Sequence, residues 1–177
     1  MANLELIKEL RNLTGAKISD CNLALKNSNN NLKEALIYLE EEAIKFAKKK
    51  KNRLTKEGLI VSYIHDNDKI GVLLDLRCET DFVAKHSEFK KLALDIATHI
   101  AYSETLFINE EIITSEMLKK IKANSKLELD KTTIKEYCLL NQYFFKDSTK
   151  TVDRYIDKWI YFFGENIVVN TFYKLNI

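Results

Sequence analysis

The spacing of apolar residues changes at Gly58, and this change limits what the chain can fold into. Before Gly58, apolar residues recur every three or four positions, as on one face of an α-helix. After it, the segments GLIVSYI and KIGVLLDLRC follow a period of two, which is typical of β-strands. Because the two patterns occupy separate stretches, we predict an α+β fold that begins with helices.

Residues 1–45 predict three short helices. The first ends at Gly15, and a second starts near Ser19 or Asp20, either of which can cap it. The third follows Asn31. This residue and the glutamate three positions later form a pattern that resembles a capping box. On the first helix, four apolar residues share one face: Leu4, Ile7, Leu10 and Leu13.

A basic segment follows these helices. The stretch KFAKKKKNRLTK, residues 45–56, holds six lysines and one arginine. We interpret residues 46–57 as a solvated linker. The alternative is a nucleic-acid-binding patch running from Lys45 to Lys56, which would bind duplexes in a strongly salt-dependent way. A net charge of only +2 and the lack of aromatics beyond Phe46 argue against it, so no nucleic-acid partner is expected.

Residues 58–177 predict a single α+β core domain, a small antiparallel sheet covered by helices. The turn-forming residues 65–68 connect the two strands of a hairpin. A helix capped by Ser87 is expected to run to about Tyr102, with short helices near 114–123 and 131–140. After a further helix from Val152, NIVVNTFYKLNI predicts a third strand that pairs with the hairpin, since two strands alone are barely stable.

No pattern in the sequence predicts a catalytic, metal or cofactor site, so we do not expect an enzyme. The three cysteines are far apart, which favours buried thiols over disulfides or zinc. The three histidines lie outside any phosphate-binding or nucleophile motif. No apolar run approaches the roughly 20 residues of a membrane span, and the N-terminus lacks a signal-peptide layout. We therefore expect a cytoplasmic protein with no membrane partner.

The stretch RCETDFVAK, residues 77–85, places an acid beside a large aromatic where a strand should end. One interpretation is structural: Phe82 anchors the corner between strand and helix, and Thr80 caps the helix. The other is that the pair faces a partner.

Four motifs occur in an order that closely resembles the bacterial elongation factor Ts family, in its short form with one core. They are TGAKISDCNLAL at 14–25, KEGLIVSYI with KIGVLLDLRCETDFVAK at 56–85, CLLNQYFFKDSTKTV at 138–152 and GENIVV at 164–169. The resemblance covers nearly the whole chain. It implies a ubiquitin-associated-like three-helix domain followed by the core.

The resemblance also implies a function, guanine-nucleotide exchange on elongation factor Tu during translation elongation. The partner would be bound in its GDP-bound and nucleotide-free states. In the family, a Thr-Asp-Phe-Val segment docks on the partner and disturbs its magnesium site, a role that falls here on Thr80, Asp81, Phe82 and Val83. A second contact, from the N-terminal domain, falls on Gly15, Ile18 and Ser19.

Two further hypotheses accompany the resemblance. The short form of the family seen in some thermophiles works as a homodimer joined by a cysteine near the C-terminus, a place that Tyr173 takes here. A non-covalent homodimer through the edge of the last strand is therefore our hypothesis. The alternative function is an adaptor that binds helices or ubiquitin-like folds through the three-helix domain. It predicts that residues 1–45 suffice for binding, whereas nucleotide exchange requires the core.

Overall fold

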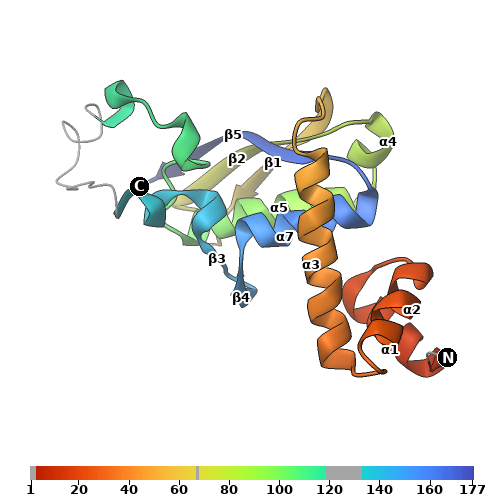
Figure 1. Cartoon of the computed structure of the whole chain (residues 1–177). Helices are drawn as coiled ribbons and strands as arrows, with labels where there is room; N and C mark the ends of the chain where they lie inside the picture. The colour runs from red at the N-terminus through yellow and green to blue at the C-terminus, as the bar shows by residue number, and fades with distance from the viewer. Residues whose placement is uncertain (1–2, 67, 119–132) are drawn as a thin grey trace. The chain divides into compact units, whose positions relative to one another are not determined.

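The computed structural model describes residues 3–66, 68–118 and 133–177 (Figure 1). The chain divides into two compact units. The first contains residues 1–54 together with 156–167, and the second contains residues 55–155 together with 168–177. The division falls inside helix α7 (Val152–Phe163), so this helix contributes residues to both units.

Three helices begin the first unit, as the sequence predicts. They are α1 (Leu4–Thr14), α2 (Ile18–Asn27) and α3 (Leu32–Lys50). Asn3 and Asn31 cap α1 and α3, because each side-chain oxygen accepts a hydrogen bond from a backbone N–H in the first turn. Only half of the predicted capping box is present: the Asn31 side chain accepts from the Glu34 N–H at 3.4 Å, but the Asn31 N–H donates to the Ser28 carbonyl, and the Glu34 carboxylate accepts from the Asn31 side-chain amide at 2.9 Å instead.

Two details of these helices differ from the prediction. On α1 only Ile7 and Leu10 are buried, while Leu4 and Leu13, which lie in the terminal turns, are exposed. The predicted cap of α2 at Ser19 or Asp20 is wrong, because α2 already begins at Ile18 and its preceding residue makes no side-chain cap. Gly15 ends α1 in the left-handed conformation, with φ 71°. The connection to α2, which begins at Ile18, is therefore short.

Helix α3 continues five residues into the segment 46–57 that we interpreted as a linker. Its buried face explains the extension. Ala43 and Ala47, four residues apart, continue the inward row that Ala35 and Leu39 begin. The lysines at 48 and 49 point away from this row and are exposed, so they leave the helix intact.

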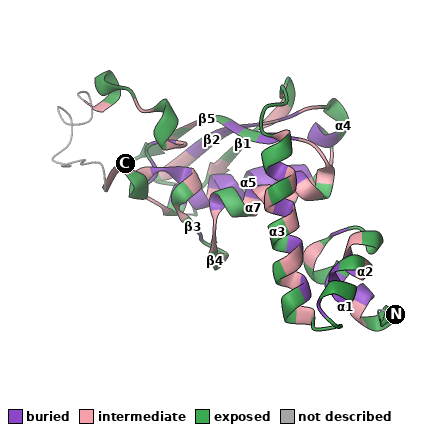
Figure 2. Ribbon diagram, viewed as in Figure 1, coloured by how far each residue is buried: buried purple, intermediate pink, exposed green. Residues whose placement is uncertain are grey.

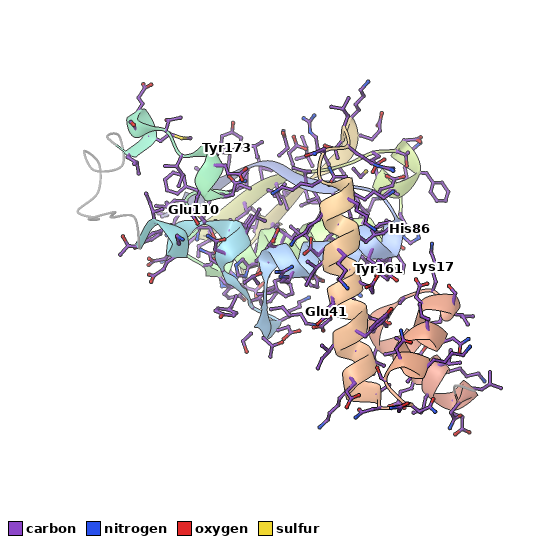
Figure 3. The ribbon with its side chains drawn as sticks, in the orientation of Figure 1. Lys17, Glu41, His86, Glu110, Tyr161 and Tyr173 are labelled. Carbon is purple, nitrogen blue, oxygen red and sulfur yellow. The ribbon has the colours of Figure 1, made fainter. Side chains whose placement is uncertain are left out.

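The second half of α7 belongs to the same unit, although the predicted division at residues 45 and 57 places it in the core domain. Tyr161, labelled in Figure 3, packs against the apolar cluster of α1, α2 and α3 and donates to Asp20 at 2.6 Å. Its ring also meets Phe46 edge-on at 5.5 Å. Burial, helped by the Asp20 carboxylate, raises the pKa of the Tyr161 hydroxyl. The periodicity of either segment cannot reveal a contact between residues so far apart in the sequence.

The second unit is built on a three-stranded sheet with the order β1–β2–β5. β1 (Glu57–Ile64) and β2 (Ile70–Cys78) form the predicted antiparallel hairpin, and β5 (Ile167–Asn176) pairs with the other side of β2 as predicted. β5 runs antiparallel to β2, since the Ile177 N–H donates to the Lys69 carbonyl while the Asn170 amide reaches Asp75. β1 and β5 are therefore the edges of this sheet.

Helix α5 (Ser87–Tyr102) packs against β1 and β2, with the predicted bounds. Figure 2 shows the buried residues of α5 and β2 in purple. The buried apolar side chains come from alternate positions of β2 and one face of α5: Val72, Leu74, Leu76, Cys78, Phe89, Leu92, Ala93, Ile96 and Ile100. The α+β class is thus confirmed. The cap is His86 rather than Ser87, because the His86 Nδ1 accepts from the Glu88 N–H at 3.2 Å.

The segment after α5 is less regular than predicted. A short hairpin, β3 (Tyr143–Phe144) with β4 (Asp147–Thr151), has no counterpart in the prediction. In place of a helix near 131–140 the chain forms 3-10 turns from Thr133 onward, and residues 131–132 lie outside the described part. The helix predicted near 114–123 is present at residues 115–118, residue 114 is not helical, and residues 119–123 lie outside the described part. Across the described ranges, no helix is both long and apolar enough to cross a membrane.

His99 is buried in α5 and connects that helix to the irregular segment. Its Nε2 lies 3.0 Å from the Gln142 side-chain oxygen, while its Nδ1 accepts from the Phe145 N–H at 3.3 Å. These two bonds select the neutral ring with its proton on Nε2. Burial lowers the pKa of His99, which also favours the neutral form. Since Gln142 accepts from Thr105 as well, at 2.8 Å, His99 takes part in a structural network.

Candidate functional site

The four residues predicted to contact a partner lie at a single turn of helix between β2 and α5 (Figure 1). Helix α4 spans only Asp81–Ala84, and Thr80 precedes it in an extended conformation. The Thr80 hydroxyl accepts from the Val83 N–H at 3.5 Å, and the Thr80 carbonyl accepts from the Ala84 N–H at 3.2 Å. Thr80 therefore caps α4, as the structural interpretation expected.

Phe82 projects from this turn into solvent. Its side chain is 79% exposed, although a phenylalanine ring is among the groups that gain most from burial. The structural interpretation, in which Phe82 anchors the corner, is therefore wrong. A ring this exposed on a capped turn is available to a partner without any unfolding of the chain.

Val83 takes the opposite orientation. It is only 4% exposed, and Ala84 beside it is also buried. Successive residues of a helix point about 100° apart, so when Val83 and Ala84 face the interior, Asp81 and Phe82 face outward. Val83 thus anchors the turn that the sequence assigned as a whole to partner contact, and the accessible side chains are those of Thr80, Asp81 and Phe82.

Asp81 forms an exposed ion pair with Lys85, four residues later on the same turn. Their charged atoms are 2.7 Å apart. The hydrogen bond from Lys85, with the charge of its ammonium group, lowers the pKa of Asp81, and the same pair raises the pKa of Lys85. Exposed pairs of this kind contribute little to stability, because solvent screens the two charges. Asp81 is therefore a fixed negative charge next to Phe82 that can exchange Lys85 for another cation at small cost.

The second predicted contact region lies in the first unit. Gly15 and Ser19 are exposed, and Ile18 is 56% exposed at the start of α2. Leu13 and Leu23 are also exposed there, and the prediction did not include them in this contact. These residues lie close in sequence around the α1–α2 connection. The region therefore exposes apolar side chains to solvent as well as the backbone at Gly15.

Lys85 was missed by the sequence-based reasoning, although a signal existed. An acid and a lysine four residues apart on a helix pair with each other, and DFVAK has this spacing. The signal was overlooked because a helix of four residues cannot be predicted from periodicity. Cys78, which contacts the carbonyl of Thr80, was assigned only as a buried thiol; it is buried, like Cys21 and Cys138.

Among the residues that the structure describes, no cluster of His, Cys, Asp or Glu is arranged to hold a metal ion. The turn at residues 80–85 offers an exposed aromatic ring and an exposed ion pair.

Residues 3–176 match the sequence profile of the family described as Elongation factor TS. The chain belongs to the elongation factor Ts family. Among similar proteins, an Elongation factor Ts of Methylacidiphilum infernorum is 43% identical over 100% of this chain and 97% of its own length. Proteins of the same name from Pseudothermotoga lettingae and Thermotoga maritima are 36% and 37% identical, over 98% and 99% of this chain and 96% of their own lengths.

Membership of the elongation factor Ts family confirms the resemblance found in the four motifs. Because the alignments span nearly the full length of these relatives, the likeness includes both units of the structure. The chain is therefore related as a whole to translation elongation factors, and the turn at Thr80–Ala84 lies well within the matched range.

Proposed function

We propose that this chain is the guanine-nucleotide exchange factor of elongation factor Tu, acting in the cytoplasm during translation elongation. In this proposal it promotes GDP release by inserting Phe82, with Asp81 beside it, near the magnesium and nucleotide site of the partner. The observation that carries the proposal is the exposed Phe82 ring on a capped turn in a chain of this family. The factor makes and breaks no covalent bond.

Insertion of the Phe82 ring into the partner supplies the free energy that promotes GDP release. Burying a phenylalanine side chain that was in water contributes roughly 1.5–3 kcal/mol. Because the ring is already exposed and Val83 is buried behind it, little of this free energy is spent on rearranging the factor. The free energy is then available to displace groups in the partner that support its nucleotide site.

Asp81 adds an electrostatic component. Magnesium requires a nearly octahedral set of oxygen ligands and is commonly held by few protein groups together with the phosphates. A small shift of one supporting element therefore weakens magnesium binding, and with it GDP binding, more than it weakens other contacts. The Asp81 carboxylate, released from Lys85, can compete for a polar group of that support.

Thermodynamic linkage gives a test of this mechanism. If the factor weakens GDP binding by some ratio, GDP must weaken binding of the factor by the same ratio. We expect the chain to bind nucleotide-free elongation factor Tu at least about tenfold more tightly than the GDP-bound form, a coupling of at least about 1.4 kcal/mol. Isothermal titration of both forms measures the ratio, and equal affinities would exclude the mechanism.

The exposed residues around the α1–α2 connection support a second contact with the partner. We assign it to Gly15, Ile18 and Ser19, to which the exposed Leu13 and Leu23 add apolar area. We also propose that residues 1–45, 46–57 and 58–177 act as a three-helix domain, a basic segment and a core, although the second half of α7 packs with the three helices.

A non-covalent homodimer through the edge of the last strand is a further part of the proposal. β5 is an edge of the three-stranded sheet, and its exposed side chains include Tyr173 (labelled in Figure 3) and Leu175. An exposed edge strand with apolar side chains favours pairing with another chain. Multi-angle light scattering at micromolar concentration should give twice the mass of the chain, and a monomeric mass would exclude the dimer.

A further inference from the structure

The end of β2 is tied to the α4 turn by a thiol. Cys78, the last residue of β2, is completely buried, and its Sγ lies 3.2 Å from the carbonyl oxygen of Thr80. The same carbonyl accepts the first helical hydrogen bond of α4, from the Ala84 N–H at 3.2 Å. One oxygen thus receives a donor from the strand and a donor from the turn.

This tie has a consequence for the geometry of α4 because the helix is so short. A helix of four residues has too few internal hydrogen bonds to hold its own conformation, so its orientation depends on contacts with the rest of the fold. The contacts of α4 with the rest of the fold include the buried side chains of Val83 and Ala84 and the hydrogen bond from the Cys78 thiol to the Thr80 carbonyl. This hydrogen bond acts on the peptide immediately before Asp81.

We propose that Cys78 is a positioning residue for nucleotide exchange: its thiol holds the Thr80 carbonyl so that Phe82 leaves the turn in the direction required for insertion. The inference rests on the function proposed above and assigns no contact between Cys78 and the partner. It predicts that Cys78 acts on exchange only through Phe82.

Cys138 provides a matched control. It is also completely buried, and its thiol lies 3.3 Å from the backbone carbonyl of Ile134, remote in sequence from the α4 turn. Cys78→Ala and Cys138→Ala therefore remove the same atoms and the same kind of hydrogen bond. A purely structural role would give the two variants similar effects on exchange.

The test is a double-mutant cycle on the maximal rate of fluorescent GDP release from elongation factor Tu at saturating factor. We expect Cys78→Ala to lower this rate about two- to fivefold more than Cys138→Ala, the range that corresponds to one weak sulfur–oxygen hydrogen bond. In the Phe82→Ala background, Cys78→Ala should cause no further loss, because the ring that it orients is absent. Thermal unfolding of each variant identifies a temperature at which all of them are folded, and the rates are compared at that temperature.

Cys78→Ser keeps a donor at the same position and should retain a rate nearer to that of the unmodified chain, even if its unfolding temperature falls. Cys78→Ser also provides the test if Cys78→Ala does not fold. The inference is overturned if Cys78→Ala matches Cys138→Ala, if its loss persists in the Phe82→Ala background, or if Cys78→Ser is as slow as Cys78→Ala. A chain that does not accelerate GDP release at all would instead overturn the proposed function.

Discussion

Replacing Phe82 with alanine should slow the release of GDP from elongation factor Tu about tenfold or more at a given concentration of factor. The side chain is 79% exposed, so its removal leaves the core of this chain intact. What is lost is the free energy of inserting the ring into the partner, roughly 1.5–3 kcal/mol, and about 1.4 kcal/mol corresponds to one decade in rate. Stopped-flow measurement with a fluorescent GDP gives the rate directly.

The matched control for Phe82→Ala is another exposed apolar residue of the same unit. Ile60 on β1 is 73% exposed, and Ile60→Ala should leave the release rate within about twofold of the unmodified value, since exposed substitutions rarely change more than about 0.5 kcal/mol. Equal rates for Phe82→Ala and the unmodified chain would remove Phe82 from the mechanism, whatever the effect of Ile60→Ala.

Replacing Gly58 with alanine should destabilise the second unit by about 3 kcal/mol or more. Gly58 lies opposite Arg77 in the β1–β2 ladder with φ 158°. A Cβ atom at this position would overlap the Leu76 carbonyl oxygen and would be 2.8 Å from the Arg77 Cα. Both are backbone atoms of the central strand, so relief of the clash requires the two strands to separate. Urea unfolding should show a markedly lower midpoint.

Gly71 offers a direct comparison because it belongs to the same hairpin. A Cβ atom there would meet only the Ile64 Cδ1 at 3.2 Å, the end of a flexible side chain that can turn aside. Gly71→Ala should therefore change the free energy of unfolding by less than about 1 kcal/mol. Equal losses of stability in Gly58→Ala and Gly71→Ala would show that the close approach at Gly58 does not determine the effect.

Local patterns in the sequence predict the regular elements of this fold well. The change of period at Gly58 identifies the hairpin, and the stripe of apolar residues after Ser87 identifies α5 with its bounds. Both elements bury one continuous face, so the spacing of their apolar residues indicates the type and position of each element. The third strand follows from the instability of an isolated two-stranded ribbon.

Features that depend on contacts between distant residues could not be predicted. The second half of α7 belongs to the first unit, where Tyr161 donates to Asp20, and neither segment shows this in its own pattern. The hairpin β3–β4 follows a segment held by the Gln142 network, which joins α5 to residues after Thr133. In both cases the tertiary contact, rather than local propensity, decides the structure.

The sequence identifies the segment that forms the α4 turn but not the orientation of its side chains. The motif TDFV was recognised from the family resemblance, which gives all four residues the same role. Which side chains face outward depends on the phase of α4, and this phase is set by the Thr80 cap and the burial of Val83. A turn of four residues is too short for a hydrophobic pattern to define that phase.

Release of fluorescent GDP from elongation factor Tu, measured with unlabelled GTP in excess and increasing amounts of this chain, tests the proposed function most directly. Exchange by way of a ternary complex predicts that the observed rate rises with the concentration of the chain and reaches a plateau far above the spontaneous rate. A rate that stays at the spontaneous value at every concentration would contradict it.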